Sequence, residues 1–208
     1  MEEIRTENAL PVSQATLVCA ASIDEAMTAA RDIAAAALCT GPEPRPCRQC
    51  SHCRKVARGI HPDVIILGRL EDDKGRPKRE ISVDQIRDLS ADACILPNEA
   101  RRKVYIIREA ETMNIPAQNA ALKLLEEPPL GAVFLLCTTN PSQLLPTVRS
   151  RCTMIICGTA AGEQDKELES LAEAYLKAAA SGSRAKLFGW GSSNEAMDGR
   201  RAADFVDC

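Results

Sequence analysis

With 208 residues the chain can bury one full core, and too few residues remain for a second large domain. Its net charge of −3 argues against a broadly basic nucleic-acid binder, and an aromatic content of 3% disfavours base-stacking surfaces. Because no apolar run reaches membrane-spanning length and the start MEEIRTENAL does not resemble a secretory signal, we expect a cytoplasmic protein without membrane contact.

The first predicted elements are a buried strand and a helix that follows it directly. The strand, Thr16–Ala20, is short, apolar and partly β-branched. Ser22 offers a hydroxyl N-cap with Glu25 three residues later, which is a capping box, and apolar residues at helical spacing continue to Leu38. Phosphate-binding α/β proteins carry a glycine-rich loop ending in lysine at such a junction, but this one has neither glycine nor lysine.

A cysteine-rich insertion, ALCTGPEPRPCRQCSHC, follows this helix. It brings Cys39, Cys47, Cys50 and Cys53 into one loop that has almost no apolar residues. Four thiolates at this spacing predict a structural Zn²⁺ site with no open coordination position. An iron–sulfur cluster is the alternative, although the downstream Cys-Pro of ferredoxins is absent. His52 is expected to point away from the four sulfurs.

Five more cysteines lie in or beside apolar stretches and are expected to be small buried side chains: Cys19, Cys94, Cys137, Cys152 and Cys157.

Strands and helices then alternate along the chain. Four further strands are predicted at Val64–Leu67, Val104–Ile107, Val133–Cys137 and Met154–Cys157, with helices at Val83–Ala93 and Ala117–Glu126. Gly68–Arg79 is predicted to be an exposed charged loop. Nearly continuous apolar strands fit a parallel sheet that is covered on both faces, so the fold class is α/β with a five-stranded parallel sheet. The α/β domain ends near residue 158; residues 159–167 are expected to form a linker and 168–208 a helical tail.

Five motifs, in this order and at this spacing, resemble one protein family. They are HPDVIIL (61–67), ISVDQIRDL (81–89), RRKVYIIREAETM (101–113), QNAALKLLEEPP (118–129) and FLLCTTNPSQLLPTVRSRC (134–152). With the cysteines they cover about residues 8–158 and resemble the clamp-loader subunits of bacterial DNA polymerase III. The resemblance implies a RecA/AAA-like fold for residues 1–158, with the zinc module (39–54) inserted after the first helix. The tail resembles the start of the family's helical collar.

The resemblance also implies a nucleotide loop that this chain does not carry. Counting back from the first cysteine of the cluster places Ala20 and Glu25 at the two glycines of the loop, Ala26 at its lysine and Met27 at its hydroxyl residue. A phosphate cradle needs bare backbone amides, a cation and an oxygen ligand for magnesium, and these residues supply none of them.

The family's acidic pair after the third strand is altered as well. Arg108 replaces the aspartate on the magnesium side, and Glu109 is expected to be an exposed acid. Residues 138–140 are assigned to turn and cap chemistry, and Lys123 to a solvated helix face. We therefore expect no bound nucleotide and no ATPase activity, a pattern similar to that of the family's delta-prime members.

The motif Ser150-Arg151-Cys152 is the retained part of the family's chemistry. In the family this arginine reaches the ATP site of the neighbouring subunit, where its always-charged, forked guanidinium suits phosphate. The alternative is a surface arginine paired with an acid, and Arg149 is the nearby candidate for the same role. The resemblance implies as partners gamma/tau-like ATP-binding subunits, delta-like subunits and the sliding-clamp machinery, with primer-template DNA met only through the assembled complex.

Two other functions remain open. One is an ATPase that binds nucleotide through an atypical loop. The other is a zinc-ribbon module that binds nucleic acid through the cations around the cysteines: Arg45, Arg48, Arg54, Lys55 and Arg58.

Overall fold

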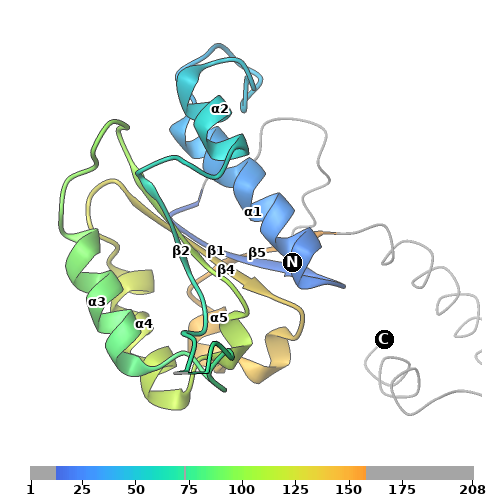
Figure 1. Ribbon diagram of the computed structural model, residues 1–208, viewed down its shortest axis with the longest axis vertical. Coiled ribbons are helices and arrows are strands. Elements are labelled where there is room, and N and C mark those ends of the chain that lie inside the picture. Colours follow the sequence, from blue (N-terminus) through green and yellow to red (C-terminus); the bar gives the residue numbers. More distant parts are fainter. Residues whose placement is uncertain (1–12, 73, 158–208) are drawn as a thin grey trace, which may run out of the picture. The chain divides into compact units, whose positions relative to one another are not determined.

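The computed structural model describes residues 13–72 and 74–157. Within them a single five-stranded parallel sheet has the strand order β2-β3-β4-β1-β5 (Figure 1). This confirms the predicted parallel sheet, its five strands and the RecA/AAA-like fold class. The predicted linker 159–167 and helical tail 168–208 lie outside the described residues.

The elements follow one another in the alternating order expected from the sequence. They are β1 (Ala15–Ala20), α1 (Ile23–Leu38), α2 (Ser51–Ala57), β2 (Val64–Leu67), α3 (Val83–Ala93), β3 (Lys103–Ile107), α4 (Ile115–Glu126), β4 (Ala132–Thr138), α5 (Pro146–Arg149) and β5 (Thr153–Cys157). Short 3-10 turns lie at Ala110–Thr112 and Pro141–Gln143.

Helices cover both faces of the sheet. Helices α1 and α2 lie on one face and α3, α4 and α5 on the other (Figure 1). In β3 the side chains of Val104 and Ile106 pack toward α1, whereas Tyr105 and Ile107 pack toward α3 and α4. Every residue of β1, β3 and β4 is buried, which is why these strands are apolar almost without interruption.

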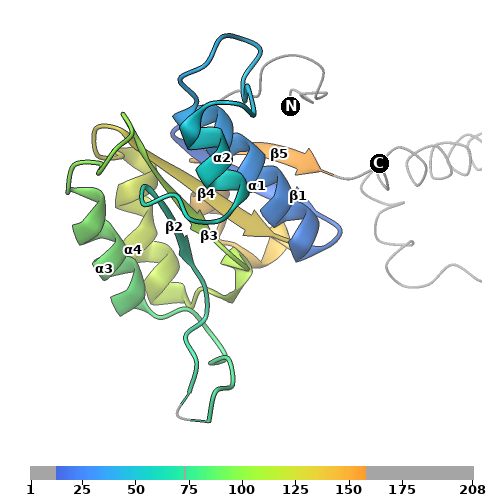
Figure 2. The ribbon, with the colours of Figure 1, turned by 45° about the horizontal axis from the view of Figure 1, so that its top comes forward.

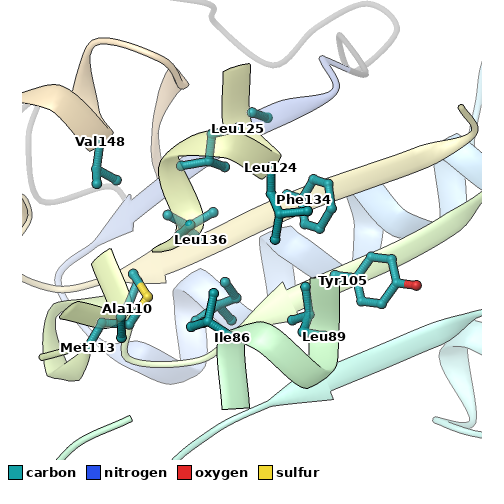
Figure 3. Packing of buried hydrophobic residues seen from close by; sticks show 14 of the residues in the cluster. Ile86, Leu89, Tyr105, Ala110, Met113, Leu124, Leu125, Phe134, Leu136 and Val148 are labelled. Carbon is teal, nitrogen blue, oxygen red and sulfur yellow. The ribbon is translucent and has the colours of Figure 1, made fainter. Parts of the chain in front are cut away.

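The larger core lies under α3 and α4 (Figure 3). Its centre is Tyr105 of β3 stacked on Phe134 of β4, with ring centroids 5.2 Å apart. Ile86 and Leu89 of α3 pack around these rings, and Leu124 of α4 packs from the neighbouring helix. These positions lie in the two helices that the sequence predicts at Val83–Ala93 and Ala117–Glu126.

Three details differ from the sequence-based expectation. Helix α4 begins at Ile115 rather than residue 117, because the side chain of Asn114 caps it by accepting from the amide of Ala117. The short helices α2 and α5 are not predicted by periodicity, since helices of this length contain too few turns to show it. Cys94 is exposed rather than buried, since it lies at the C-cap of α3.

The segment Gly68–Arg79 projects as a charged loop, as the sequence predicts (Figure 2). The loop is closed by the bridge between Glu71 and Pro77.

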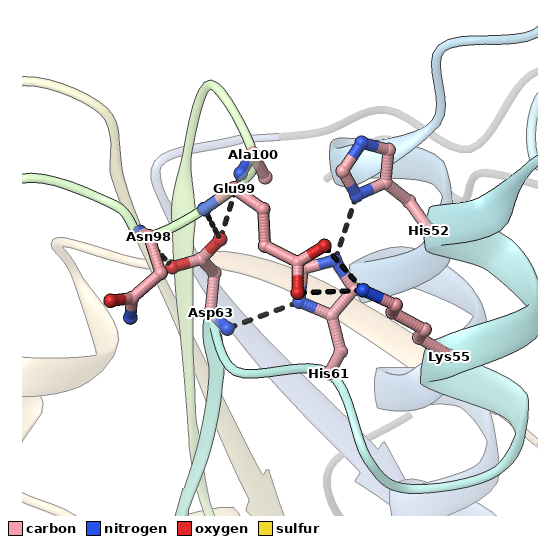
Figure 4. A network of polar contacts seen from close by, with 7 residues as sticks. All are labelled: His52, Lys55, His61, Asp63, Asn98, Glu99 and Ala100. Carbon is pink, nitrogen blue, oxygen red and sulfur yellow. Dashed lines mark hydrogen bonds and ion pairs between the residues drawn. The ribbon is translucent and has the colours of Figure 1, made fainter.

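Asp63, immediately before β2, connects two loops at the amino edge of the sheet (Figure 4). Its side chain is fully buried. Oδ1 accepts the amide of Asn98 at 2.5 Å, and Oδ2 accepts those of Glu99 at 2.9 Å and Ala100 at 2.8 Å. Burial alone favours the neutral acid, but the three amide donors outweigh it and hold the pKa of Asp63 below its ordinary value.

A histidine pair extends this network to α2 (Figure 4). The ring Nδ1 of His61 accepts the amide of Asp63 at 3.1 Å, so His61 carries its proton on Nε2 and donates it to Nδ1 of His52 at 2.8 Å. Burial, together with the nearby His52, lowers the pKa of His61 and favours this neutral form. Lys55 of α2 forms an ion pair with Glu99, so α2 and the loop before β3 are fixed side by side.

The Asp63 network yields the first prediction. Replacing Asp63→Asn puts an NH₂ donor among three amide donors, and at least one buried amide loses its acceptor. We expect the free energy of unfolding at neutral pH, measured by urea denaturation, to fall by about 2–3 kcal/mol. The matched control is Asp84→Asn, whose exposed side chain pairs with Arg87 and whose replacement should cost less than about 1 kcal/mol.

The same pair of proteins has an expected pH dependence. Because the folded-state pKa of Asp63 lies below its ordinary value of 3.8, the stabilisation is complete above that pH and is lost as the pH falls through the folded-state pKa. The stability difference between wild type and Asp63→Asn should therefore narrow under acid conditions. A difference that stays constant down to strongly acid pH contradicts the role given to the carboxylate.

Candidate functional site

The four predicted metal ligands lie together where α1 ends and α2 begins. The Sγ atoms of Cys39, Cys47, Cys50 and Cys53 are all within 4.8 Å of one another. Cys39 is the C-cap residue of α1 and Cys50 the N-cap residue of α2. The two helix ends therefore position two of the four sulfurs, and the group can hold a metal ion. His52 lies outside this group, as predicted, and pairs with His61 instead.

Backbone amides surround the sulfurs. The amide of Cys47 donates to Cys39 Sγ, that of Cys50 to Cys47 Sγ and that of Cys53 to Cys50 Sγ, each at 3.4 Å. For Cys50, burial opposes ionisation, but backbone donors prevail and lower the pKa of the thiol to about 5. Burial raises the pKa of Cys53 to about 12. Backbone donors thus lower the pKa of Cys47 as well as that of Cys50 and favour the thiolate, the form in which cysteine binds a metal.

Gly41 is packed against the cluster. A Cβ atom built there would lie 2.8 Å from Cys47 Cβ and would overlap Cys47 Sγ as well. The amide of Gly41 also donates to Cys39 Sγ at 3.4 Å. The loop therefore needs a residue without a side chain at this position, a requirement that no pattern in the sequence indicates.

The junction of β1 and α1 is short. Only two residues, Ala21 and Ser22, separate the end of β1 from the start of α1. The hydroxyl of Ser22 accepts the amide of Glu25 at 3.3 Å, and the Glu25 carboxylate accepts the amide of Ser22 at 3.3 Å. The predicted capping box is confirmed. Ala26 and Met27, counted above at the lysine and hydroxyl positions, are buried inside α1.

Glu109 is not the exposed acid that the sequence predicts. It is partly buried, and its carboxylate accepts from Nε of Arg69 at 3.0 Å and from Nη2 at 3.1 Å. The sequence could not predict this pair because Arg69 belongs to the loop after β2, 40 positions away in the chain. Arg108, the preceding residue, is exposed and lies 3.9 Å from Asp24 Oδ1 in the first turn of α1. The negative charge of Glu109 is thus balanced by Arg69 within the chain.

The polar residues at the end of β4 form hydrogen bonds with neighbouring residues of the chain. Thr138 Oγ1 accepts the amide of Asn140 at 3.1 Å, which is the turn chemistry expected there. Thr139 instead donates its hydroxyl to Oε1 of Glu111 at 3.0 Å. Glu111 is not among the site residues predicted from the sequence. Its other oxygen, Oε2, is buried without a hydrogen-bond partner among residues 13–72 and 74–157.

Arg151 lies on the surface in the turn between α5 and β5. Its Nε is 3.2 Å from Oε2 of Glu126 at the end of α4, and its Nη1 donates to the carbonyl of Thr147 at 3.1 Å. Nη2 makes no hydrogen bond within the described part of the chain. Arg149 differs because its Nε is buried and has no partner within the same residues. Of the two arginines, Arg151 is the more exposed residue. Among the residues the structure describes, no helix is both long and apolar enough to cross a membrane.

The comparisons with known proteins agree on one family. The profile of the family described as "DNA polymerase III, delta subunit" matches residues 4–158. DNA polymerase III subunit delta' of Pseudomonas aeruginosa is 42% identical over 111 residues, which are 53% of this chain and 32% of that protein. DNA polymerase III subunit tau of Bacillus subtilis is 36% identical over 126 residues, 60% of this chain and 21% of the relative.

The chain thus covers a third or less of the length of these two relatives. Among solved structures, a DNA polymerase III gamma subunit-related protein of Thermotoga maritima is 22% identical, covers 76% of this chain and 44% of its own, and has a TM-score of 0.47. That likeness is too weak to add to the strand order given above. The family profile, by contrast, matches most of the sequence, and the chain belongs to the DNA polymerase III delta subunit family.

Proposed function

We propose that this chain is a clamp-loader subunit that neither binds nor hydrolyses ATP and that donates Arg151 to the ATP site of a neighbouring subunit. The observation that supports the absence of ATP binding is the geometry of the β1–α1 junction. Its two-residue connection leaves no cradle, and Ser22 and Glu25 already satisfy each other's backbone amides. Asp24 and Glu25 also place negative charge in the first turn of α1, where a nucleotide phosphate would have to lie.

The contacts of Arg151 support the second half. Glu126 and the carbonyl of Thr147 engage Nε and Nη1, so the guanidinium is oriented while Nη2 stays available for a phosphate oxygen. The ion pair with Glu126 is partly exposed and contributes no more than about 1 kcal/mol, so exchange for a more highly charged phosphate costs little. At the neighbouring site the guanidinium would stabilise the charge that develops on the γ-phosphate as it is transferred.

We further propose that the four cysteines hold a structural Zn²⁺. Zinc–sulfur distances near 2.3 Å in a tetrahedron require sulfurs about 3.8 Å apart. Sulfurs that all lie within 4.8 Å of one another fit a single ion of this kind, whereas a cluster of several irons needs wider spacing. With four protein ligands the ion has no position for substrate, so its role would be to order a loop that lacks a core of its own.

The partners that fit this function are the other subunits of the loader: gamma/tau-like subunits that bind ATP, delta-like subunits and the sliding clamp they load. The delta' and tau names of the relatives support this assignment. Nothing in this role requires the chain to touch primer-template DNA outside the assembled complex.

The absence of a nucleotide site predicts a negative binding result with a positive control. Titration of the full chain with ATP and magnesium into the millimolar range should give no saturable heat, because the capping box occupies amides of the β1–α1 turn and the turn carries two acids. A gamma/tau-like subunit measured in the same buffer should bind. Saturable binding by this chain contradicts the proposal and favours the atypical-ATPase alternative.

The arginine role predicts a loss of turnover in the assembled loader. Arg151→Ala should lower the kcat of the site it reaches by about 10³-fold or more, with little change in the chain's melting temperature, because the exposed side chain contributes little to folding. Arg87→Ala is the matched control, since Arg87 is also exposed and also paired with one acid, Asp84. Equal DNA-stimulated ATP turnover in both variants would contradict the trans role.

The metal site predicts a requirement for glycine next to the sulfurs. Protein purified without added metal should contain close to one zinc per chain by elemental analysis. Gly41→Ala should weaken zinc binding by about 10–100-fold in a chelator competition, because the added Cβ displaces Cys47. Gly68→Ala is the control, since a Cβ there meets no atom within 4 Å. Iron with visible colour would instead indicate a cluster.

A further inference from the structure

The positive charge of the chain is concentrated in two segments that are distant in sequence. Residues 40–58 and 97–102 together contain seven cationic and two acidic side chains, a formal charge of +5, whereas the whole chain carries −3. Six of the seven cations are exposed arginines, and we name this set the arginine face: Arg45, Arg48, Arg54, Arg58, Arg101 and Arg102.

The tertiary structure brings the two segments together. The strands are parallel, so the loops that precede β2 and β3 meet at the amino edge of the sheet. Two sets of contacts join these loops directly: the ion pair of Lys55 with Glu99, and the bonds from Asp63 to the amides of residues 98–100 (Figure 4). The His52–His61 pair fixes α2 against the loop before β2. The arginine face is therefore carried on a fixed frame.

The arginines of this face lack the acid partners that most other arginines of the described fold have. Five of those others have a carboxylate oxygen within 4.0 Å: Arg69, Arg76, Arg87, Arg108 and Arg151. Within residues 13–72 and 74–157, none of the six on the arginine face has one. The two acids of these segments do not offset the charge, since Glu99 is already paired with Lys55 and Glu43 forms no ion pair in those residues.

We propose that the arginine face binds the phosphate backbone of nucleic acid. Exposed guanidinium groups without acid partners are the groups that displace counterions from phosphates. The two segments contain no Phe, Tyr or Trp, the residues that stack on bases and that anchor protein interfaces, so charge contacts to phosphate are favoured over base reading and over an acidic protein partner. This contact goes beyond the proposed function, which requires no direct contact between this chain and DNA.

The test is binding of the full zinc-containing chain to a fluorescently labelled DNA duplex of arbitrary sequence, followed by anisotropy at salt concentrations from about 50 to 200 mM. One variant neutralises four residues of the face, Arg54→Gln, Arg58→Gln, Arg101→Gln and Arg102→Gln. The control removes the same charge from the exposed loop after β2, with Lys74→Gln, Arg76→Gln, Lys78→Gln and Arg79→Gln. Circular dichroism and zinc content confirm that both variants fold.

The face variant should bind at least about tenfold more weakly, and its slope of log K against log salt should be smaller by up to about 3–4, because each lost phosphate contact contributes about 0.9. The control should stay within about twofold of wild type. Three results overturn the proposal: no binding by wild type at low salt, equal loss in both variants, or competition by polyglutamate as effective as that by DNA. The last would identify an acidic protein as the partner. None of these results bears on the ATP or Arg151 predictions.

Discussion

Burial of a parallel sheet on both of its faces is the constraint on which the rest of this structure depends. After each strand the chain must cross back to the amino edge of the sheet, where the next parallel strand begins. Every loop of the fold therefore lies either at the carboxyl edge or at the amino edge. The strands themselves are almost entirely apolar and carry no chemistry. The candidate functions of the chain therefore lie at the two edges, and each edge is organised in a different way.

At the carboxyl edge the polar groups are largely occupied by one another. Ser22 and Glu25 close the turn after β1, Glu109 is held by Arg69, and Thr139 bonds to Glu111. An edge of this kind, in an open α/β sheet, is where a ligand usually binds. Here several of the hydrogen-bond donors that such a ligand would use already bond to acceptors within the chain. This is the physical reason for the proposed loss of nucleotide binding.

At the amino edge the loops are held by polar contacts rather than by a core. Helix α2 has only seven residues, of which Cys53 and Val56 pack into the core beside α1, and it is also held by the four sulfurs at its start and by His61 and Glu99 along its side. Asp63 is the central residue, because three backbone amides converge on one buried carboxylate. The same contacts that order the cysteine loop also place the two arginine-rich segments beside each other.

The sequence by itself determined the fold class, the five strands, the capping box at Ser22 and the grouping of the four cysteines in one cluster. Each of these follows from local periodicity or from the spacing of residues close together in the chain. It also indicated the missing nucleotide loop. Only the tertiary structure decided that Glu109 is paired with Arg69, that Gly41 must lack a side chain, that Arg151 lies beside Glu126, and that Asp63 joins the loop before β2 to the loop before β3. The reason is physical: these contacts link groups that the folding of the sheet brings together from distant parts of the chain or across a loop with no repeating pattern, so no local pattern encodes them.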